Sequence, residues 1–275
     1  PMSRSNPTEG VRNPSTRWFE WAGGSDGGYV RWYNKDTKEQ VKADPFTFLL
    51  LDELSTVKGW HESSESGIYA NEVRDTRQDA LVVRAFKGGE LASGTYAQIR
   101  DRIVAVGGHY VASLYIAYKD DGDGLKIGNL ALKGAAAGAW MDFKRNAQTK
   151  AGPSGKTRAY LVDAVKIASY EQKKKGGTVY RVPVFTLSEV SAATNDQACA
   201  LDAELQSFIA EYLKRPKAAA ATPAQTQDDP DPDEQAAQGM RGVDTFEDDI
   251  PFVLNECMYD VGNAFERRQR RASTR

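Results

Sequence analysis

Aromatic and basic side chains recur at even spacings in three stretches of this chain. The pairs are Lys58 with Trp60, Arg84 with Phe86, and Tyr115 with Lys119. Residues two or four positions apart share one face of an extended strand. Aromatic rings stack on planar nucleobases, while lysine and arginine neutralise phosphates. Such alternation also arises on any half-buried sheet, but three pairs together favour a surface that binds unpaired nucleotides.

A fourth aromatic and basic stretch lies near the amino terminus. Tyr29, Arg31 and Tyr33 alternate along a predicted strand, so they share one face. Lys35 and Lys38 follow at the turn after that strand. We expect this hairpin to extend the nucleotide-binding surface.

The charges of the chain are segregated along its length. Residues 1–227 hold 30 bases and 26 acids, whereas residues 228–260 hold eleven carboxylates and one base, a net charge of −10. Few aliphatic residues accompany these acids, so the segment is predicted to be disordered and to compete with polyanions for the basic body. The acidic stretch contains two carboxylates beside an apolar tip: Asp248, Asp249, Ile250, Pro251 and Phe252.

The string EDDIPF at 247–252 resembles the acidic tip of bacterial and phage single-stranded DNA-binding proteins. In that family an OB domain is followed by a flexible linker and a DDIPF-type peptide that recruits other proteins. The family's phenylalanine is its last residue, whereas 23 residues follow Phe252 here. The resemblance implies a phage-type, non-catalytic protein that binds single-stranded DNA. It also implies that residues 248–252 recruit replication, recombination or repair proteins.

Motifs for other chemistry are weak. Two distant cysteines and two histidines give neither a disulfide framework nor a zinc spacing. The GPSGKT string at 152–157 lacks the strand-loop-helix context of a P-loop, so we expect an ordinary loop. We therefore expect no cofactor, no metal and no catalytic residue. Two alternatives remain: a strand-annealing or recombination mediator, and a metal-dependent nuclease that uses Glu171.

The elements that must position these residues are mostly strands. Periodicity predicts strands at 29–33, 39–41, 46–61, 68–73, 81–86 and 110–119, then a helix at 129–148. A hairpin at 158–170 and 178–187 follows, and a last helix begins near Thr194 and ends before Pro216. No apolar run approaches the roughly 20 residues of a membrane span. We expect a cytoplasmic protein, in the host cell if a phage encodes it.

This order of elements predicts a mainly β fold. We expect an enlarged OB-fold barrel with one inserted helix, a carboxyl-terminal helix and a disordered acidic tail. Residues 1–44 form an amino-terminal aromatic and basic extension, and 45–215 form the OB domain. Residues 216–247 form the acidic linker, and 248–275 hold the partner-binding peptide and a basic end. The sequence is compatible with a homo-oligomer.

Overall fold

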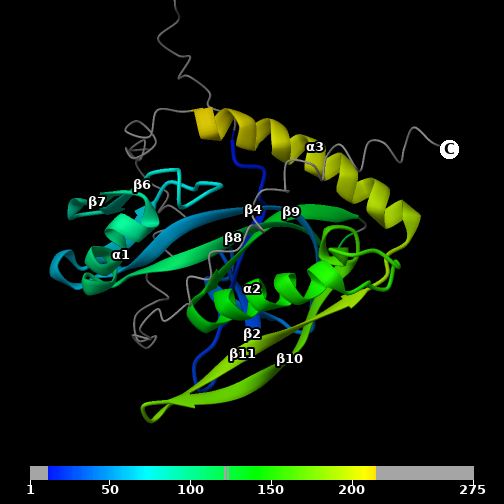
Figure 1. The fold of residues 1–275 in the computed structure, drawn as a ribbon, viewed down its shortest axis with the longest axis horizontal. Helices are drawn as coiled ribbons and strands as arrows, with labels where there is room; N and C mark the ends of the chain where they lie inside the picture. Colours follow the sequence, from blue (N-terminus) through cyan, green and yellow to red (C-terminus); the bar gives the residue numbers. More distant parts are fainter. Residues whose placement is uncertain (1–11, 121, 123, 215–275) are drawn as a thin grey trace, which may run out of the picture.

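The computed structural model describes residues 12–120, 122 and 124–214. Within them, eleven strands form one mixed sheet, which three α-helices accompany (Figure 1). The mainly β fold is therefore confirmed. None of the described helices is long and apolar enough to span a membrane.

The elements follow one another along the chain in this order. The first seven strands are β1 (Arg17–Ala22), β2 (Tyr29–Asn34), β3 (Glu39–Ala43), β4 (Phe46–His61), β5 (Ser66–Ala70), β6 (Leu81–Ala85) and β7 (Gly89–Gly94). Helix α1 (Tyr96–Ala105) comes next, then β8 (Gly108–Lys119), β9 (Leu125–Lys133) and α2 (Gly134–Thr149). The hairpin of β10 (Ala164–Lys175) and β11 (Thr178–Ser188) leads to α3 (Ala192–Lys214). Short 3₁₀ turns lie at Glu62–Ser64 and Ala159–Leu161.

Strand β4 is the spine of the sheet. It pairs with β8 from Phe48 to Gly59, with β10 at its amino-terminal end and with β5 at its carboxyl-terminal end. Aliphatic and aromatic residues occupy both of its faces, as expected for a strand buried on two sides. Its bounds match the predicted strand at 46–61.

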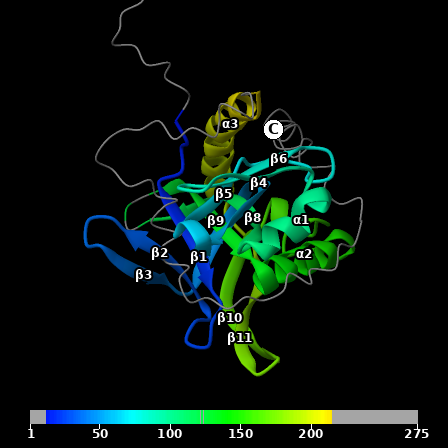
Figure 2. The same ribbon diagram turned by 90° about the vertical axis from the view of Figure 1, so that its left-hand side faces the viewer.

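Two cores lie on opposite faces of this spine. On one face, Phe48, Leu50 and Val57 pack in the cluster that includes Trp140 of α2 and Ile103 of α1. Helices α1 and α2 lie on the same side of the sheet (Figure 2). On the other face, three leucines of β4 pack under three apolar residues of α3. The leucines are Leu49, Leu51 and Leu54, and the α3 residues are Leu205, Phe208 and Ile209. Each fully buried side chain of this kind stabilises the fold by about 1.5–3 kcal/mol. We call the second surface the α3 face.

The sheet does not close into a barrel. Its pairing runs β3-β2-β1-β9-β8-β4-β5-β6-β7, and β10 with β11 branches from β4. The expected closed OB barrel is therefore not confirmed. Strand β1 pairs in parallel with β9, so the amino-terminal stretch at 17–43 continues the same sheet as the body.

The predicted helix at 129–148 began too early. Residues 125–133 form β9, which is buried between β8 and β1, and the helix begins at Gly134. Asparagine favours the N-cap position of a helix, but the Nδ2 of Asn129, the first residue of the predicted helix, donates to Ser113 Oγ inside the sheet at 2.8 Å. Tertiary pairing overrides the local capping preference here.

Three elements had no counterpart in the sequence prediction: β1, β7 and α1. A signal for α1 was present, because Thr95 and Gln98 form the capping box that opens this helix. The GPSGKT stretch is a loop, as predicted, and Ser154 donates from N and Oγ to the buried carboxylate of Asp163.

Candidate nucleic-acid interface

The strand register brings four of the predicted residues onto one face at the carboxyl-terminal end of β4. Lys58 pairs with His109 of β8, and Trp60 pairs with Gly67 of β5. Tyr69 of β5 pairs with Arg84 of β6. Directly paired residues lie on the same side of a sheet, as do residues two apart along a strand. We call the resulting set the stacking patch: Lys58, Trp60, Tyr69, Arg84, Phe86 and His109.

The side chains of the stacking patch are half-buried, so each ring or cation keeps part of its surface accessible. The Tyr69 and Phe86 rings stack with centroids 4.5 Å apart and planes inclined by 29°. Arg84 lies 3.6 Å from the carboxylate of Glu90, half of whose side chain is exposed. An exposed pair of this kind contributes about 1 kcal/mol or less, so a phosphate could displace the carboxylate. The patch thus combines ring faces with two permanent cations.

The opposite side of these strands belongs to the core. Val57, Ile68 and Val83 point away from the patch and pack in the cluster that contains Ile99 and Ile103 of α1. This packing fixes which way the patch residues point, because a one-residue slip would bury Lys58 and expose Val57.

Helix α3 covers the α3 face up to the border of the patch. The Glu72 backbone N–H, two residues beyond β5, donates to the Tyr212 hydroxyl at 2.8 Å. The last described residue, Lys214, is two positions further along the same helix. The chain therefore leaves the described body beside the stacking patch, and the acidic segment follows from that point in the sequence.

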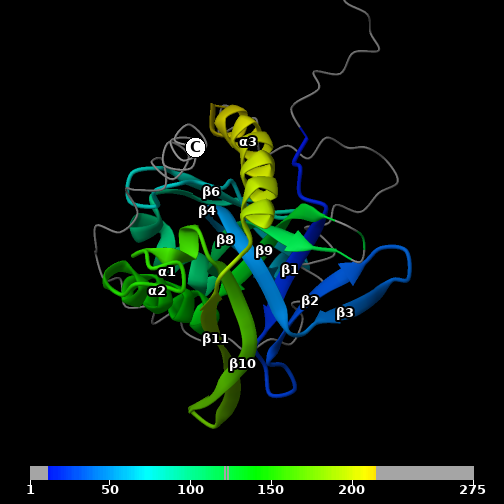
Figure 3. The same ribbon diagram turned by 90° about the vertical axis from the view of Figure 1, so that its right-hand side faces the viewer.

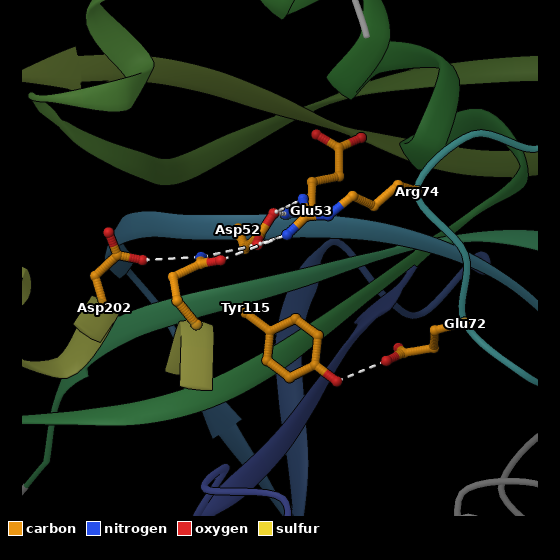
Figure 4. Close-up of polar contacts among 7 residues, drawn as sticks. Asp52, Glu53, Glu72, Arg74, Tyr115 and Asp202 are labelled. Carbon is orange, nitrogen blue, oxygen red and sulfur yellow. Dashed lines mark hydrogen bonds and ion pairs between the residues drawn. The ribbon is translucent and has the colours of Figure 1, made fainter. Parts of the chain in front are cut away.

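A buried polar network fastens α3 to the sheet (Figure 4). The Arg74 guanidinium donates two hydrogen bonds to Asp52, at 2.9 and 2.8 Å, and Asp52 is only 1% exposed. Gln206 of α3 donates from Nε2 to Asp52 Oδ2 at 2.9 Å and to Asp202 Oδ1 at 3.2 Å. The Glu53 backbone N–H adds a further bond to Asp52 at 2.8 Å. A carboxylate with four donors satisfies its buried charge, so this cluster has a structural role.

Tyr115 was predicted to contact nucleotides, and the structure corrects this. Its side chain is 1% exposed in the core beneath α3, and its hydroxyl donates to Glu72 Oε2 at 2.6 Å (Figure 4). Burial, together with the Glu72 carboxylate, raises the pKa of Tyr115 well above its usual value. The prediction gave the correct face of β8 for Tyr115, but helix α3 covers that face at Tyr115.

The predicted residues of the amino-terminal hairpin lie elsewhere. Tyr29, Arg31 and Tyr33 are half-buried on β2, while Lys35 and Lys38 are exposed around the turn to β3. Arg31 donates to Glu20 of β1 through Nε at 2.7 Å, so its charge is already balanced. Lys42 sits 3.9 Å from the centre of the Tyr29 ring, which is a cation–π contact.

Lys119 forms a third location, at the carboxyl-terminal end of β8, where it is exposed. The next residue, Asp120, pairs with Arg17 at 2.6 Å and with Lys126 at 2.6 Å. The structure therefore separates the predicted residues into the stacking patch, the β2–β3 hairpin, the Lys119 end and the buried Tyr115.

The hairpin predicted at 158–170 and 178–187 is formed by β10 and β11, and it is the most basic element of the described fold. It projects from the body separately from the β2–β3 hairpin (Figure 3). Its strands carry five bases and one acid, Glu171; the bases are Lys166, Lys173, Lys174, Lys175 and Arg181. Residues 168–177 are all exposed. The KKK run was the available sequence signal.

The outer half of this hairpin is fixed to β1 and to the glycine loop that follows it. Trp21 Nε1 donates to the Arg181 carbonyl at 2.9 Å, and Arg181 N donates to the Gly23 carbonyl at 2.7 Å. The Arg181 guanidinium also donates to the Gly27 carbonyl and lies 4.7 Å from the Tyr170 ring centre. Tyr170 is 42% exposed.

The residue proposed for a nuclease alternative lies on the same hairpin. The Glu171 side chain is 63% exposed and pairs with Lys173 at 3.3 Å. Within the described residues, no group of three or more histidine, cysteine, aspartate or glutamate side chains is arranged to hold a metal ion. The predicted partner peptide at 248–252 lies outside the described residues.

Comparisons with known proteins add no assignment. No protein-family model, curated protein or solved structure matches this chain.

Proposed function

We propose that this protein is a non-catalytic single-stranded DNA-binding protein that holds bases on the stacking patch. The observation that carries the proposal is the convergence of rings from β4, β5 and β6 with Lys58 and Arg84 on one half-exposed face. Every nucleobase has a ring face, so stacking at this patch tolerates any sequence. The two cations hold the phosphates that flank the stacked bases.

The order of strand pairing supports the proposal. Strand β4 pairs with β8, β8 pairs with β9, α2 follows β9, and β10 returns to pair with β4 before β11 completes the hairpin. A helix between the third and fourth strands of such a Greek-key arrangement is typical of the OB fold. We propose that these five strands are an OB-like unit, enlarged by β1–β3 on one side and β5–β7 on the other.

The acidic segment fits the same function. It follows α3, which ends beside the stacking patch. A tethered segment with a net charge of −10 competes with DNA for Lys58 and Arg84 and is displaced when DNA binds. The DDIPF-type peptide is then available to a replication or recombination protein.

Substitution of Trp60 tests the proposal. Stacking of one base contributes about 1–3 kcal/mol, so Trp60→Ala should weaken binding of labelled oligo-dT by roughly 5- to 150-fold. Trp18→Ala is the matched control, because Trp18 is also half-buried but lies on β1, three strands away from β4. Affinity is measured by fluorescence anisotropy, with circular dichroism to verify folding. Equal affinities for the two folded variants would contradict the stacking role.

A strand-annealing mediator is the second candidate function. It is favoured by the second basic surface on the β10–β11 hairpin, which joins β4 at the end opposite to the one that carries Trp60. An annealing assay with complementary labelled strands distinguishes the two functions: a coating protein slows annealing, and a mediator accelerates it.

A further inference from the structure

We infer that the β10–β11 hairpin is a second nucleic-acid site, which binds phosphates of a strand segment other than the one on the stacking patch. This inference rests on the proposed function and adds a site that the sequence patterns did not predict. We call residues 164–188 the basic arm.

The first argument is charge. The basic arm has five bases and one acid, a net charge of +4, and three consecutive lysines lie at its exposed end. Glu171, the one acid, pairs with Lys173 in an exposed pair that screens little of this charge. Lysines 174 and 175 point to opposite sides of the strand, so the end of the arm presents positive charge on both faces.

The second argument is rigidity. The two strands pair from Ala164–Ser188 to Lys175–Thr178, and Gly176 and Gly177 close the turn at positive φ. In the outer half of the arm, three residue pairs from the last pair before the turn, Arg181 bonds to the carbonyls of Gly23 and Gly27 through its backbone N–H and its guanidinium, which ties the arm to the body. Binding by a pre-ordered arm loses less conformational entropy than binding by a flexible lysine tail.

The third argument is position. The arm joins β4 at Phe46, at the end of β4 opposite to the one that carries Lys58. Lys58 lies twelve residues further along β4, which carries a bulge between Leu50 and Asp52, so about 40 Å at ~3.3 Å per residue is the upper bound of their separation. The lysines lie six to eight residues beyond the junction at Ile167. At ~3.4 Å per nucleotide a stacked 5-mer covers about 17 Å, whereas a 30-mer covers about 100 Å and can occupy both sites.

An exposed aromatic ring midway along the arm fits this role. Tyr170 lies against Arg181 and beside Gly28, where an added Cβ would lie 2.5 Å from the ring. With 42% of its surface accessible, Tyr170 offers one stacking position beside the phosphate-binding lysines.

The test compares two triple variants of the full chain on oligo-dT of 5 and 30 nucleotides. The arm variant is K173A/K174A/K175A. The control is R102A/R145A/K150A, which removes three charges from exposed positions on or next to α1 and α2. Each lost phosphate contact lowers the slope of log K against log salt by about 0.7 for a single strand. Three contacts lower it by about 2, which corresponds to roughly 100-fold weaker binding at 0.1 M salt if the electrostatic contribution vanishes near 1 M.

On the 30-mer, we expect the arm variant to show this reduction in slope relative to the wild type. Its affinity for the 5-mer, which binds at the patch, should stay within about threefold of the wild type. If the arm variant binds the 30-mer with the same affinity and slope as the wild type, the second site is overturned and the proposed function stays intact. An equal loss in the control variant would also overturn it, because a general charge effect would then explain the result. Failure of the wild-type protein to bind either oligonucleotide would overturn the proposed function itself.

Discussion

The Asp52–Arg74–Gln206 network should control how firmly α3 is held on the sheet, and Arg74→Met tests this. The substitution keeps a long apolar side chain but removes the two guanidinium bonds to Asp52, whose side chain is fully buried. Removal of one partner from a buried ion pair costs about 3–5 kcal/mol. Because 37% of the Arg74 side chain is exposed, we expect the lower end, about 3 kcal/mol. For a body of this size that corresponds to a melting temperature about 6–12 °C lower.

Arg77→Met is the matched control for this experiment. Arg77 lies on the same loop and pairs with Asp75 at 3.2 Å, but that pair is partly solvated. Its loss should cost about 1 kcal/mol or less. Urea denaturation gives the two free energies, and amide hydrogen exchange follows α3 directly. Arg74→Met should speed exchange in α3 around Gln206, because the Oε1 of Gln206 loses its Arg74 donor and Asp52 loses the guanidinium that orders it. Equal free energies for the two variants, with unchanged exchange in α3, would refute the assigned role of the network.

Two further predictions concern Tyr115 and the acidic segment. The raised pKa of Tyr115 gives stability that is fully present below pH 10 and is lost as pH rises further, because the unfolded state then releases the proton first. Above pH 10, the free energy of unfolding of Tyr115→Phe should therefore fall less steeply with pH than that of the wild type, by about 1.4 kcal/mol per pH unit. Urea titrations of both proteins at pH 9 and 11 measure this difference. An equal fall in both proteins would contradict the burial of the Tyr115 hydroxyl. Truncation after Arg215 should tighten single-stranded DNA binding at low salt, with a difference that fades as salt rises. Unchanged affinity in low-salt anisotropy titrations would exclude competition by the tail.

The parts of the fold that local sequence patterns determine were predicted well. The β4 strand has its predicted bounds, because a long β-rich run begins after Pro45 and ends before the polar 3₁₀ turn at Glu62–Ser64. Even spacing placed Lys58 with Trp60 and Arg84 with Phe86 correctly on one face, because the side-chain period of a strand is fixed by its geometry.

The remaining errors come from contacts between distant segments. The pattern around Tyr115 gave the right face of β8, but it contains no sign that α3, which starts 77 residues later, lies over it. Likewise, Asn129 has a local preference for capping that pairing with both neighbouring strands overrides. The predicted hairpin ended its first strand at residue 170 and left the KKK run in the turn, whereas β10 continues to Lys175 and pairs with β11 up to Lys175–Thr178.

The half-exposed rings and cations of the stacking patch are proposed to bind unpaired nucleotides. The most direct test is a titration of the protein's intrinsic tryptophan fluorescence with oligo-dT and, in parallel, with duplex DNA of equal length at the same salt. We expect saturable quenching by oligo-dT, and Trp60→Ala should lose most of it. Quenching by duplex should be much weaker, because its bases are already stacked on one another. Equal quenching by both, or quenching that persists unchanged without Trp60, would contradict the proposed binding.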